Sequence, residues 1–365
     1  MNGWVSKWVK KNYPIAKSDL CTCFMSRGMV LSASRGYFAM VTSQTWMFIT
    51  SFEKLRKQLL ESTAILTLCD TKSTGLHADN FTANAAFSVY NRRLERYEGS
   101  YFKLNQPIEQ KSERLLEALA DPGCGWFYRA DADGFGVIPG SPIAYWASKN
   151  ALRSFKGGKT LSKCAKPRSG FSTGDNERFI HFWWEVERRD TKTDCFNLQE
   201  ADDAAEYWFP LNKGGGYRKW YGNNIYIVEW KNKAAEMKRC AGYRSGCESE
   251  YFKQGITWGS ISSAVLSVRF SPEGFMPNRK GAMAFSTSLE DSLYCLGLLN
   301  SSTTLYFLRF LAPTLDFSEG PIGSVPLIRL KNTGAEKLAN SSVNLARQDF
   351  DSFEESWDFK RHPLI

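Results

Sequence analysis

The first 95 residues switch between two hydrophobic periods. Apolar residues recur every three or four positions in three segments, which predicts helices over 4–9, 18–36 and 51–63. Short apolar runs between and after them predict buried strands over 37–42, 64–69 and 85–90. This order of helix, strand, helix, strand, loop and strand is typical of half of an α/β sheet that ends in an antiparallel hairpin.

The other half of that sheet is missing from the pattern. A doubly wound sheet normally begins with the strands that bind a nucleotide-like ligand, and no such strands precede the first predicted helix. We therefore expect residues 1–95 to form an incomplete α/β half-domain, either truncated or completed by a partner. Without a partner, its first strand is an exposed sheet edge.

The remaining residues predict three further segments. Residues 96–134 are expected to be a helical connector, in which Asp121-Pro122-Gly123 ends a helix. Residues 135–330 are expected to be a mixed α+β domain, with an acidic surface insertion over Glu185–Glu206. Its predicted elements are a helix over Ile143–Phe155, strands over 225–230, 264–270 and 283–285, and a helical region over 289–311. Residues 331–365 predict a polar helical tail.

The stretch from Tyr207 to Lys233 has the most unusual composition. It contains eight aromatic residues, five Lys or Arg, one acid and the glycine run Gly214–Gly216. Interleaved rings and cations are typical of surfaces that stack on flat groups and neutralise phosphates. An aromatic-rich hairpin in a large core is the alternative interpretation.

Charge supports a polyanionic partner. The chain of 365 residues has 47 Lys and Arg against 38 Asp and Glu, a net charge of +9. Between Phe135 and Gly174 there is no acid, whereas seven cations occur there: Lys149, Arg153, Lys156, Lys159, Lys163, Lys166 and Arg168. This run is a candidate for contact with the DNA backbone.

Several other kinds of chemistry are disfavoured. The nine cysteines include no Cys-x-x-Cys pair and the three histidines are scattered, so neither a metal site nor a catalytic triad is expected. The most apolar long stretch, Leu293–Ala312, is too polar to span a bilayer. We expect a soluble, cytoplasmic protein. The basic charge disfavours a carbohydrate-binding protein.

Seven stretches are similar, in order, to the PglX-type adenine-specific DNA methyltransferases of BREX phage-defence systems. They are KKNYPIAKSDL, GYFAMVTSQTWMFITSFEKLRKQLLE, IPGSPIAYW, STGDNERF, WFPLNKGGGYRKWYGN, YFKQGITWGSISSA and LGLLNSSTTLYFLRFLAPTLDFSEGPIGSVPL. The resemblance extends from residue 4 to about residue 330. It implies the carboxy-terminal part of such an enzyme: an incomplete Rossmann-like methyltransferase half-domain followed by a DNA target-recognition domain.

The departures from this family concern catalysis. Its members bind S-adenosylmethionine through a Gly-rich loop and hold adenine with an Asn-Pro-Pro-Tyr loop, and no Asn-Pro-Pro occurs here. Asp121–Gly125 imitates the cofactor loop, but a helical pattern precedes it, so we expect only a turn there. Catalytic and cofactor-binding residues are therefore expected to be absent, and S-adenosylmethionine belongs to the intact enzyme. Phe81 occupies the region that stacks on the flipped base in related enzymes, although core packing suits it better.

The leading hypothesis is thus the target-recognition part of an adenine-N6 DNA methyltransferase, inactive alone. The alternative is a stand-alone DNA-binding specificity module that serves a separate catalytic partner. Expected partners are double-stranded DNA and an amino-terminal methyltransferase half or other BREX proteins. The candidate DNA-binding residues are Lys156, Lys159, Lys163, Lys166, Arg168, Asp175, Asn176, Arg178, Lys213, Arg218, Lys219, Trp220, Tyr221, Asn223 and Asn224.

Overall fold

The computed structural model describes residues 1–71, 84–157, 159–260, 265–313, 316–329 and 334–364. The chain divides into two compact units, Met1–Gly157 and Gly158–Ile365. Both mix helices and strands, so the expected α/β character of the chain is confirmed.

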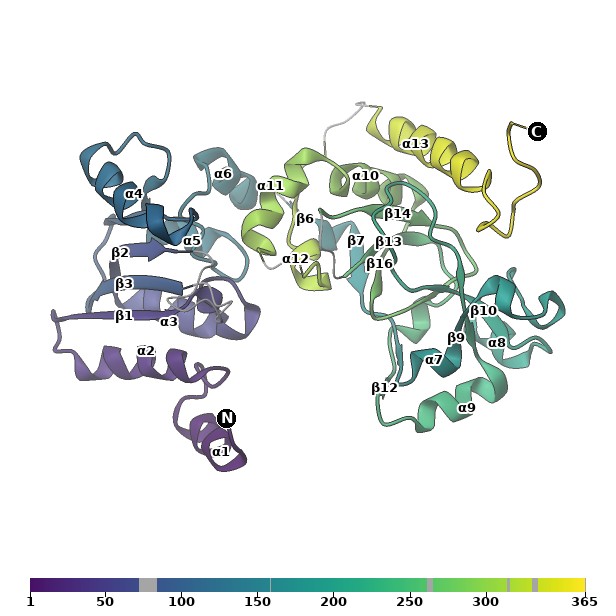
Figure 1. Ribbon diagram of the computed structural model, residues 1–365, viewed down its shortest axis with the longest axis horizontal. Coiled ribbons are helices and arrows are strands. Elements are labelled where there is room, and N and C mark those ends of the chain that lie inside the picture. The colour runs from purple at the N-terminus through teal and green to yellow at the C-terminus, as the bar shows by residue number, and fades with distance from the viewer. Residues whose placement is uncertain (72–83, 158, 261–264, 314–315, 330–333, 365) are drawn as a thin grey trace. The chain divides into compact units, whose positions relative to one another are not determined.

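The first unit is built on a five-stranded sheet (Figure 1). Its strands are β1 (Tyr37–Ser43), β2 (Ala64–Asp70), β3 (Asn84–Tyr90), β4 (Glu98–Lys103) and β5 (Phe127–Asp131). Its helices are α1 (Gly3–Asn12), α2 (Leu20–Leu31), α3 (Glu53–Ser62), α4 (Ile108–Ala120), α5 (Ala132–Val137) and α6 (Lys149–Gly157). The elements expected in residues 1–95 are therefore confirmed, with ends that differ by a few residues.

The strand order of this sheet is β1-β3-β2-β4-β5. Strand β3 lies between β1 and β2 and runs antiparallel to both, whereas β2 and β4 are parallel. This places β1 at one edge of the sheet, as the sequence predicted. The expected connector 96–134 supplies strands β4 and β5 as well as a helix. Tyr101 and Phe102 of β4 lie in register beside β2, so this segment is part of the sheet.

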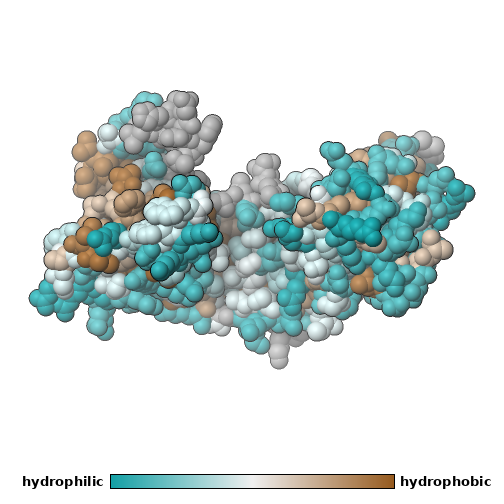
Figure 2. Space-filling view, turned by 90° about the horizontal axis from the view of Figure 1, so that it is seen from below, coloured by the Kyte–Doolittle hydropathy of each residue, from teal (hydrophilic) through white to brown (hydrophobic). Residues whose placement is uncertain are grey.

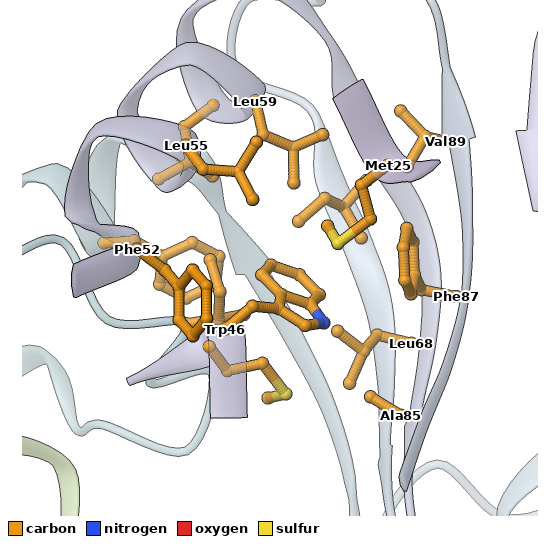
Figure 3. Packing of buried hydrophobic residues seen from close by; sticks show 14 of the residues in the cluster. Met25, Trp46, Phe52, Leu55, Leu59, Leu68, Ala85, Phe87 and Val89 are labelled. Atoms are coloured by element: carbon orange, nitrogen blue, oxygen red, sulfur yellow. The ribbon is translucent and has the colours of Figure 1, made fainter. Parts of the chain in front are cut away.

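A hydrophobic core joins the sheet to its helices (Figure 3). Leu55 and Leu59 lie one turn apart on α3 and are both fully buried. They face the core that also holds Trp46, whose ring lies 5.2 Å from the ring of Phe87 on β3. The Trp46 indole donates a hydrogen bond to the hydroxyl of Thr42 at 3.0 Å, so its polar atom is satisfied inside the core.

Residues 135–157 pack with the first unit, although we expected them to open the second domain. Phe135, Ile143 and Tyr145 belong to the first core. The helix predicted over Ile143–Phe155 begins only at Lys149. The reason is a tertiary contact: the amide of Ile143 donates to the carbonyl of Met47 at 2.9 Å, which holds this segment extended after Pro142.

The second unit contains two four-stranded sheets, ordered β15-β10-β11-β9 and β14-β13-β16-β7, and two strand pairs, β12-β8 and β17-β6 (Figure 1). The strands are β6 (Lys159–Thr160), β7 (Ala165–Arg168), β8 (Ser172–Thr173), β9 (Ile180–Phe182), β10 (Trp208–Asn212), β11 (Tyr226–Glu229), β12 (Tyr243–Arg244), β13 (Gly255–Gly259), β14 (Val268–Ser271), β15 (Met276–Pro277), β16 (Gly281–Ser286) and β17 (Pro326–Leu327). The helices are α7 (Asn176–Phe179), α8 (Leu198–Asp203), α9 (Lys231–Arg239), α10 (Leu289–Leu299), α11 (Ser302–Leu311), α12 (Glu319–Gly323) and α13 (Ala335–Phe350).

Two expectations for this unit are corrected. The helical region 289–311 is two helices, because Ser301 caps α11 by accepting a hydrogen bond from the amide of Thr304 at 3.3 Å. The acidic segment Glu185–Glu206 is not a surface insertion throughout, since Cys195 and Ala201 are buried in the core of the unit.

Candidate nucleic-acid interface

The acid-free run supplies exposed cations to both units. Lys156 ends α6 in the first unit, whereas Lys159, Lys163, Lys166 and Arg168 lie in the second unit. Lys166 and Arg168 alternate on β7, which is an edge strand of its sheet. All five side chains are exposed, and none has an ion-pair partner among the residues that the structure describes. Exposed, unpaired cations suit contact with phosphates.

The segment Thr173–Arg178 forms a capped turn. The Asp175 carboxylate accepts a hydrogen bond from the amide of Arg178 at 3.2 Å and so caps α7, and the Thr173 hydroxyl donates to Asn176 at 2.8 Å. Arg178 pairs with Glu236 and lies 5.0 Å from the ring of Phe179. The Asp175 carboxylate and the Asn176 amide oxygen therefore hold the turn, while the three predicted residues stay exposed.

The three predicted cations of the central stretch have partners within the protein. Lys213 lies 4.5 Å above the ring of Tyr226, and burial lowers the pKa of Lys213. Arg218 lies 3.6 Å from the carboxylate of Asp349. Lys219 donates a hydrogen bond to the carbonyl of Asn300 at 2.9 Å. These cations are held in place rather than free in solvent.

The tail helix α13 covers part of this stretch. Tyr221 is 4% exposed, with the Arg347 guanidinium 4.6 Å from its ring and the Phe350 ring at 6.1 Å. Burial is the main reason that the pKa of Tyr221 is raised. Asn224 is also buried, at 4% exposure. In this structure Tyr221 and Asn224 contribute to packing, as the core interpretation of the stretch expected.

Backbone conformation sets the central loop apart from its surroundings. Five of the ten residues between Gly214 and Asn223 have positive φ: Gly214 (100°), Gly215 (110°), Trp220 (73°), Gly222 (111°) and Asn223 (60°). Trp220 is half-buried, and its amide donates to the carbonyl of Val268 at 2.9 Å. The Asn223 side chain donates to the carbonyl of Gly216 at 2.9 Å. Left-handed residues other than glycine concentrate at functional sites.

Sequence reasoning missed two features of the second unit. Trp184, Phe182 and Tyr226 stack in a row, with ring centroids 4.7 Å and 5.1 Å apart, and Trp184 is 47% exposed. Arg269 is fully buried on β14. Two signals in the sequence could have indicated these features. They are the adjacent tryptophans at 183 and 184 and a single cation inside an apolar strand.

The other candidates divide as follows. Phe81 lies outside the described residues. Asp121–Gly125 is a turn between α4 and β5, as predicted: the Asp121 carboxylate accepts a hydrogen bond from the amide of Gly123 at 2.8 Å. Because a helix rather than a strand precedes it, this turn does not fit the cofactor.

No helix in the described parts of the chain is long and apolar enough to cross a membrane.

Solved structures with a similar fold are restriction–modification enzymes. The Type IIL enzyme MmeI, in complex with DNA, matches with a TM-score of 0.59 and 11% identity over 100% of this chain and 50% of its own. The Type ISP enzyme LlaGI, a nuclease-deletion mutant with a DNA substrate mimic, matches with a TM-score of 0.53 and 11% identity over 95% and 39%. The chain thus has the fold of parts of restriction–modification enzymes.

Sequence comparison is more specific. Residues 1–76 match the family described as Eco57I restriction-modification methylase. The chain is 34% identical to the adenine-specific methyltransferase PglX of Lacticaseibacillus casei (strain Zhang), over 99% of this chain and 31% of the relative. It is 32% identical to the adenine-specific methyltransferase BrxX of Escherichia coli O9:H4 (strain HS), over 100% and 29%. The predicted resemblance to PglX-type adenine-specific methyltransferases is confirmed along the whole chain, which spans about a third of these relatives.

Proposed function

We propose that the chain is the target-recognition part of an adenine-N6 DNA methyltransferase of the PglX type, joined to the second half of its catalytic α/β domain. The observation that carries this proposal is the similarity to PglX and BrxX over the whole chain. The likeness of its fold to enzymes solved with DNA supports it. In the intact enzyme, S-adenosylmethionine would supply the methyl group, whereas this chain would supply contacts to duplex DNA.

In this proposal the exposed cations bind phosphates. Lys159, Lys163, Lys166 and Arg168 carry four positive charges without ion-pair partners in the described chain. Each phosphate that a protein neutralises releases counterions, so affinity falls as salt rises. These side chains would position the duplex, whereas the loop Gly214–Asn223 and the exposed ring of Trp184 would be candidates to contact the bases.

The first unit carries a surface that suits an amino-terminal methyltransferase half. Eight large apolar side chains on α1, α2 and β1 are exposed: Trp4, Trp8, Leu20, Phe24, Val30, Leu31, Tyr37 and Val41. Figure 2 shows hydrophobic surface gathered on the first unit, at the left of the view. Edge strand β1 adds unpaired backbone groups to this surface, and an unpaired edge invites another strand. Strands supplied by an amino-terminal methyltransferase half would cover both.

Fluorescence anisotropy with a duplex at several salt concentrations tests the DNA-binding proposal. We expect K159A/K163A/K166A/R168A to lower affinity and to flatten the slope of log K against log salt by about 0.9 for each lost phosphate contact. The matched control K10A/K11A/K17A/R27A removes the same charge from exposed positions of the first unit and should leave the slope unchanged. Equal slopes for both quadruple variants would refute the proposed surface.

Calorimetric titration with S-adenosylmethionine tests the catalytic part of the proposal. We expect no binding heat, because the turn Asp121–Gly125 does not fit the cofactor. Micromolar binding by the chain alone would show that it holds a cofactor site of its own. A target-recognition part that serves a catalytic half should bind the cofactor only after that half is added.

A further inference from the structure

Arg269 is a buried cation without a counter-ion. Its side chain is 1% exposed, and its Nη2 donates a hydrogen bond to the carbonyl of Gly214 at 2.9 Å. In the part of the chain that the structure describes, its Nε and Nη1 have no acceptor. Burying a charge is unfavourable unless it is paired and its hydrogen bonds are made. The site is therefore incomplete as it stands.

The neighbouring side chain of Arg218 carries a charge of the same sign as Arg269. Burial, and to a smaller extent the nearby Arg218 cation, lower the pKa of Arg269 to about 10. A pKa of about 10 still leaves Arg269 protonated at neutral pH. Two cations thus share one region of the protein, and one of them is shielded from water. Such an arrangement favours an anion.

The loop above Arg269 offers hydrogen-bond donors. Among the described residues, the backbone amides of Gly214, Gly215 and Gly216 donate to no acceptor within the protein. Successive backbone N–H groups in a turn form concave sites that bind anions. The same loop returns to the strand of Arg269, where the amide of Phe270 donates to the carbonyl of Trp220 at 2.8 Å.

We propose that Arg269 and the backbone of Gly214–Gly216 form a phosphate-binding site that takes one backbone phosphate of duplex DNA. Because glycine adopts positive and negative φ equally well, the peptide between Gly214 and Gly215 can turn over. Its carbonyl then leaves Arg269, and a phosphate oxygen takes that place. This inference rests on the proposed function and adds to it a buried residue and a movement of the loop.

The chemistry of the site selects phosphate. A guanidinium binds two phosphate oxygens at once through a planar fork of N–H groups. Arg269 leaves Nε and Nη1 unused, and each of them lies next to Nη2, so a fork forms with Nη2 once the Gly214 carbonyl has left it. A single phosphate could therefore satisfy the guanidinium and the glycine amides together.

The test uses the full chain and the variants R269M and R269K in the anisotropy assay. We expect R269M to flatten the salt slope by about 0.9, the value for one phosphate, and R269K to retain most of the slope because it keeps the charge. The control R189Q removes an arginine that is 78% exposed and should leave the slope unchanged. The melting temperature of free R269M should stay at or above that of the parent, since an unpaired charge is removed.

A purely structural role gives a different result. In that case R269M melts earlier than the parent, and the variants that fold retain the parental slope, which would overturn the inference. Hydrogen exchange of the unmodified chain provides a measurement that does not depend on a variant folding. The amides of Gly214–Gly216 should exchange more slowly when duplex is bound, and unchanged exchange would also overturn the proposal.

Inorganic phosphate distinguishes the source of the anion. If inorganic phosphate alone protects these amides fully, the site takes free phosphate and the DNA assignment fails. If a 10-bp duplex carrying uncharged methylphosphonates protects them as well as ordinary duplex does, no phosphate charge is bound there and the phosphate site is refuted. If the parent chain binds no duplex at all, the proposed function fails instead. Binding by the parent with an unchanged slope in R269M refutes this inference alone.

Discussion

The hydroxyl of Tyr145 donates a hydrogen bond to Oδ2 of Asp70 at 3.0 Å, across 75 positions of the sequence. Asp70 ends β2 and is 4% exposed, while the Tyr145 ring stacks on Tyr101 with centroids 5.1 Å apart. Burial and the Asp70 carboxylate both raise the pKa of Tyr145. This contact ties residues 135–157 to the sheet of the first unit.

Replacing Tyr145 with phenylalanine tests that tie. The ring stacking survives in Y145F, but a buried carboxylate loses a donor, so we expect the free energy of unfolding to fall by about 1–3 kcal/mol. The control Y37F changes a tyrosine that is 69% exposed and should alter stability by less than about 0.5 kcal/mol. Urea unfolding followed by tryptophan fluorescence measures both. Equal stability of Y145F and Y37F would contradict the role of the contact.

Arg329 links α10 to α13 and makes this link dependent on pH. It pairs with Asp291, with Glu290 at 2.8 Å and with Glu336 at 3.3 Å. Burial tends to raise the pKa of Asp291, but hydrogen bonds from Arg329 and Ser288 outweigh it, so the pKa lies below its ordinary value of 3.8. The stabilisation is therefore complete above pH 3.8 and is lost as pH falls through the lowered folded-state pKa.

We expect D291N to lower the melting temperature at pH 7 and to lessen its decline toward pH 3, because the variant has no carboxylate to protonate at this position. The exposed carboxylate Glu187, which is 64% exposed, provides the control E187Q. Differential scanning calorimetry at several pH values compares the three proteins. Parallel pH profiles of D291N and the parent would show that Asp291 does not contribute.

Gly214 and Gly216 should respond differently to alanine, although they belong to one glycine run. Gly214 has φ of 100°, and an added Cβ would lie 2.8 Å from the carbonyl oxygen of Lys280. Gly216 has no positive φ, and no atom lies within 4 Å of the position of its Cβ. We expect G214A to cost about 1–3 kcal/mol of stability and G216A to be neutral or to stabilise slightly. Thermal melts decide, and equal melting temperatures would contradict the strain at Gly214.

The exposed sheet edge should promote association of the isolated chain. Val41 on β1 is 66% exposed, and a lysine there would disfavour pairing with another strand. We expect V41K to shift the chain toward the monomer in size-exclusion chromatography with light scattering. The control L345K introduces the same charge at a leucine of α13 that is 67% exposed. A monodisperse parent chain would count against the edge as a docking surface.

Much of the first unit could be predicted because its signals are local. The apolar runs at 37–42, 64–69 and 85–90 and the helical period at 51–63 correspond to β1, β2, β3 and α3. Side-chain periodicity depends only on near neighbours in the sequence, so it survives without knowledge of the fold. The same holds for the turn at Asp121–Gly125. The long matching stretches indicated the family without knowledge of the fold, since a sequence match compares one residue with another directly.

Contacts between distant residues decided the rest. Tyr221 has the composition of a stacking residue, but the packing of Phe350 and Arg347 from α13 buries it. The placement of Ile143–Tyr145 in the first core likewise follows from partners such as Met47 and Asp70. Arg269 became a candidate site only because β14 carries it under Gly214, 55 positions away. Burial and charge pairing are properties of the space around a side chain, and only the tertiary structure brings the groups that fill this space together.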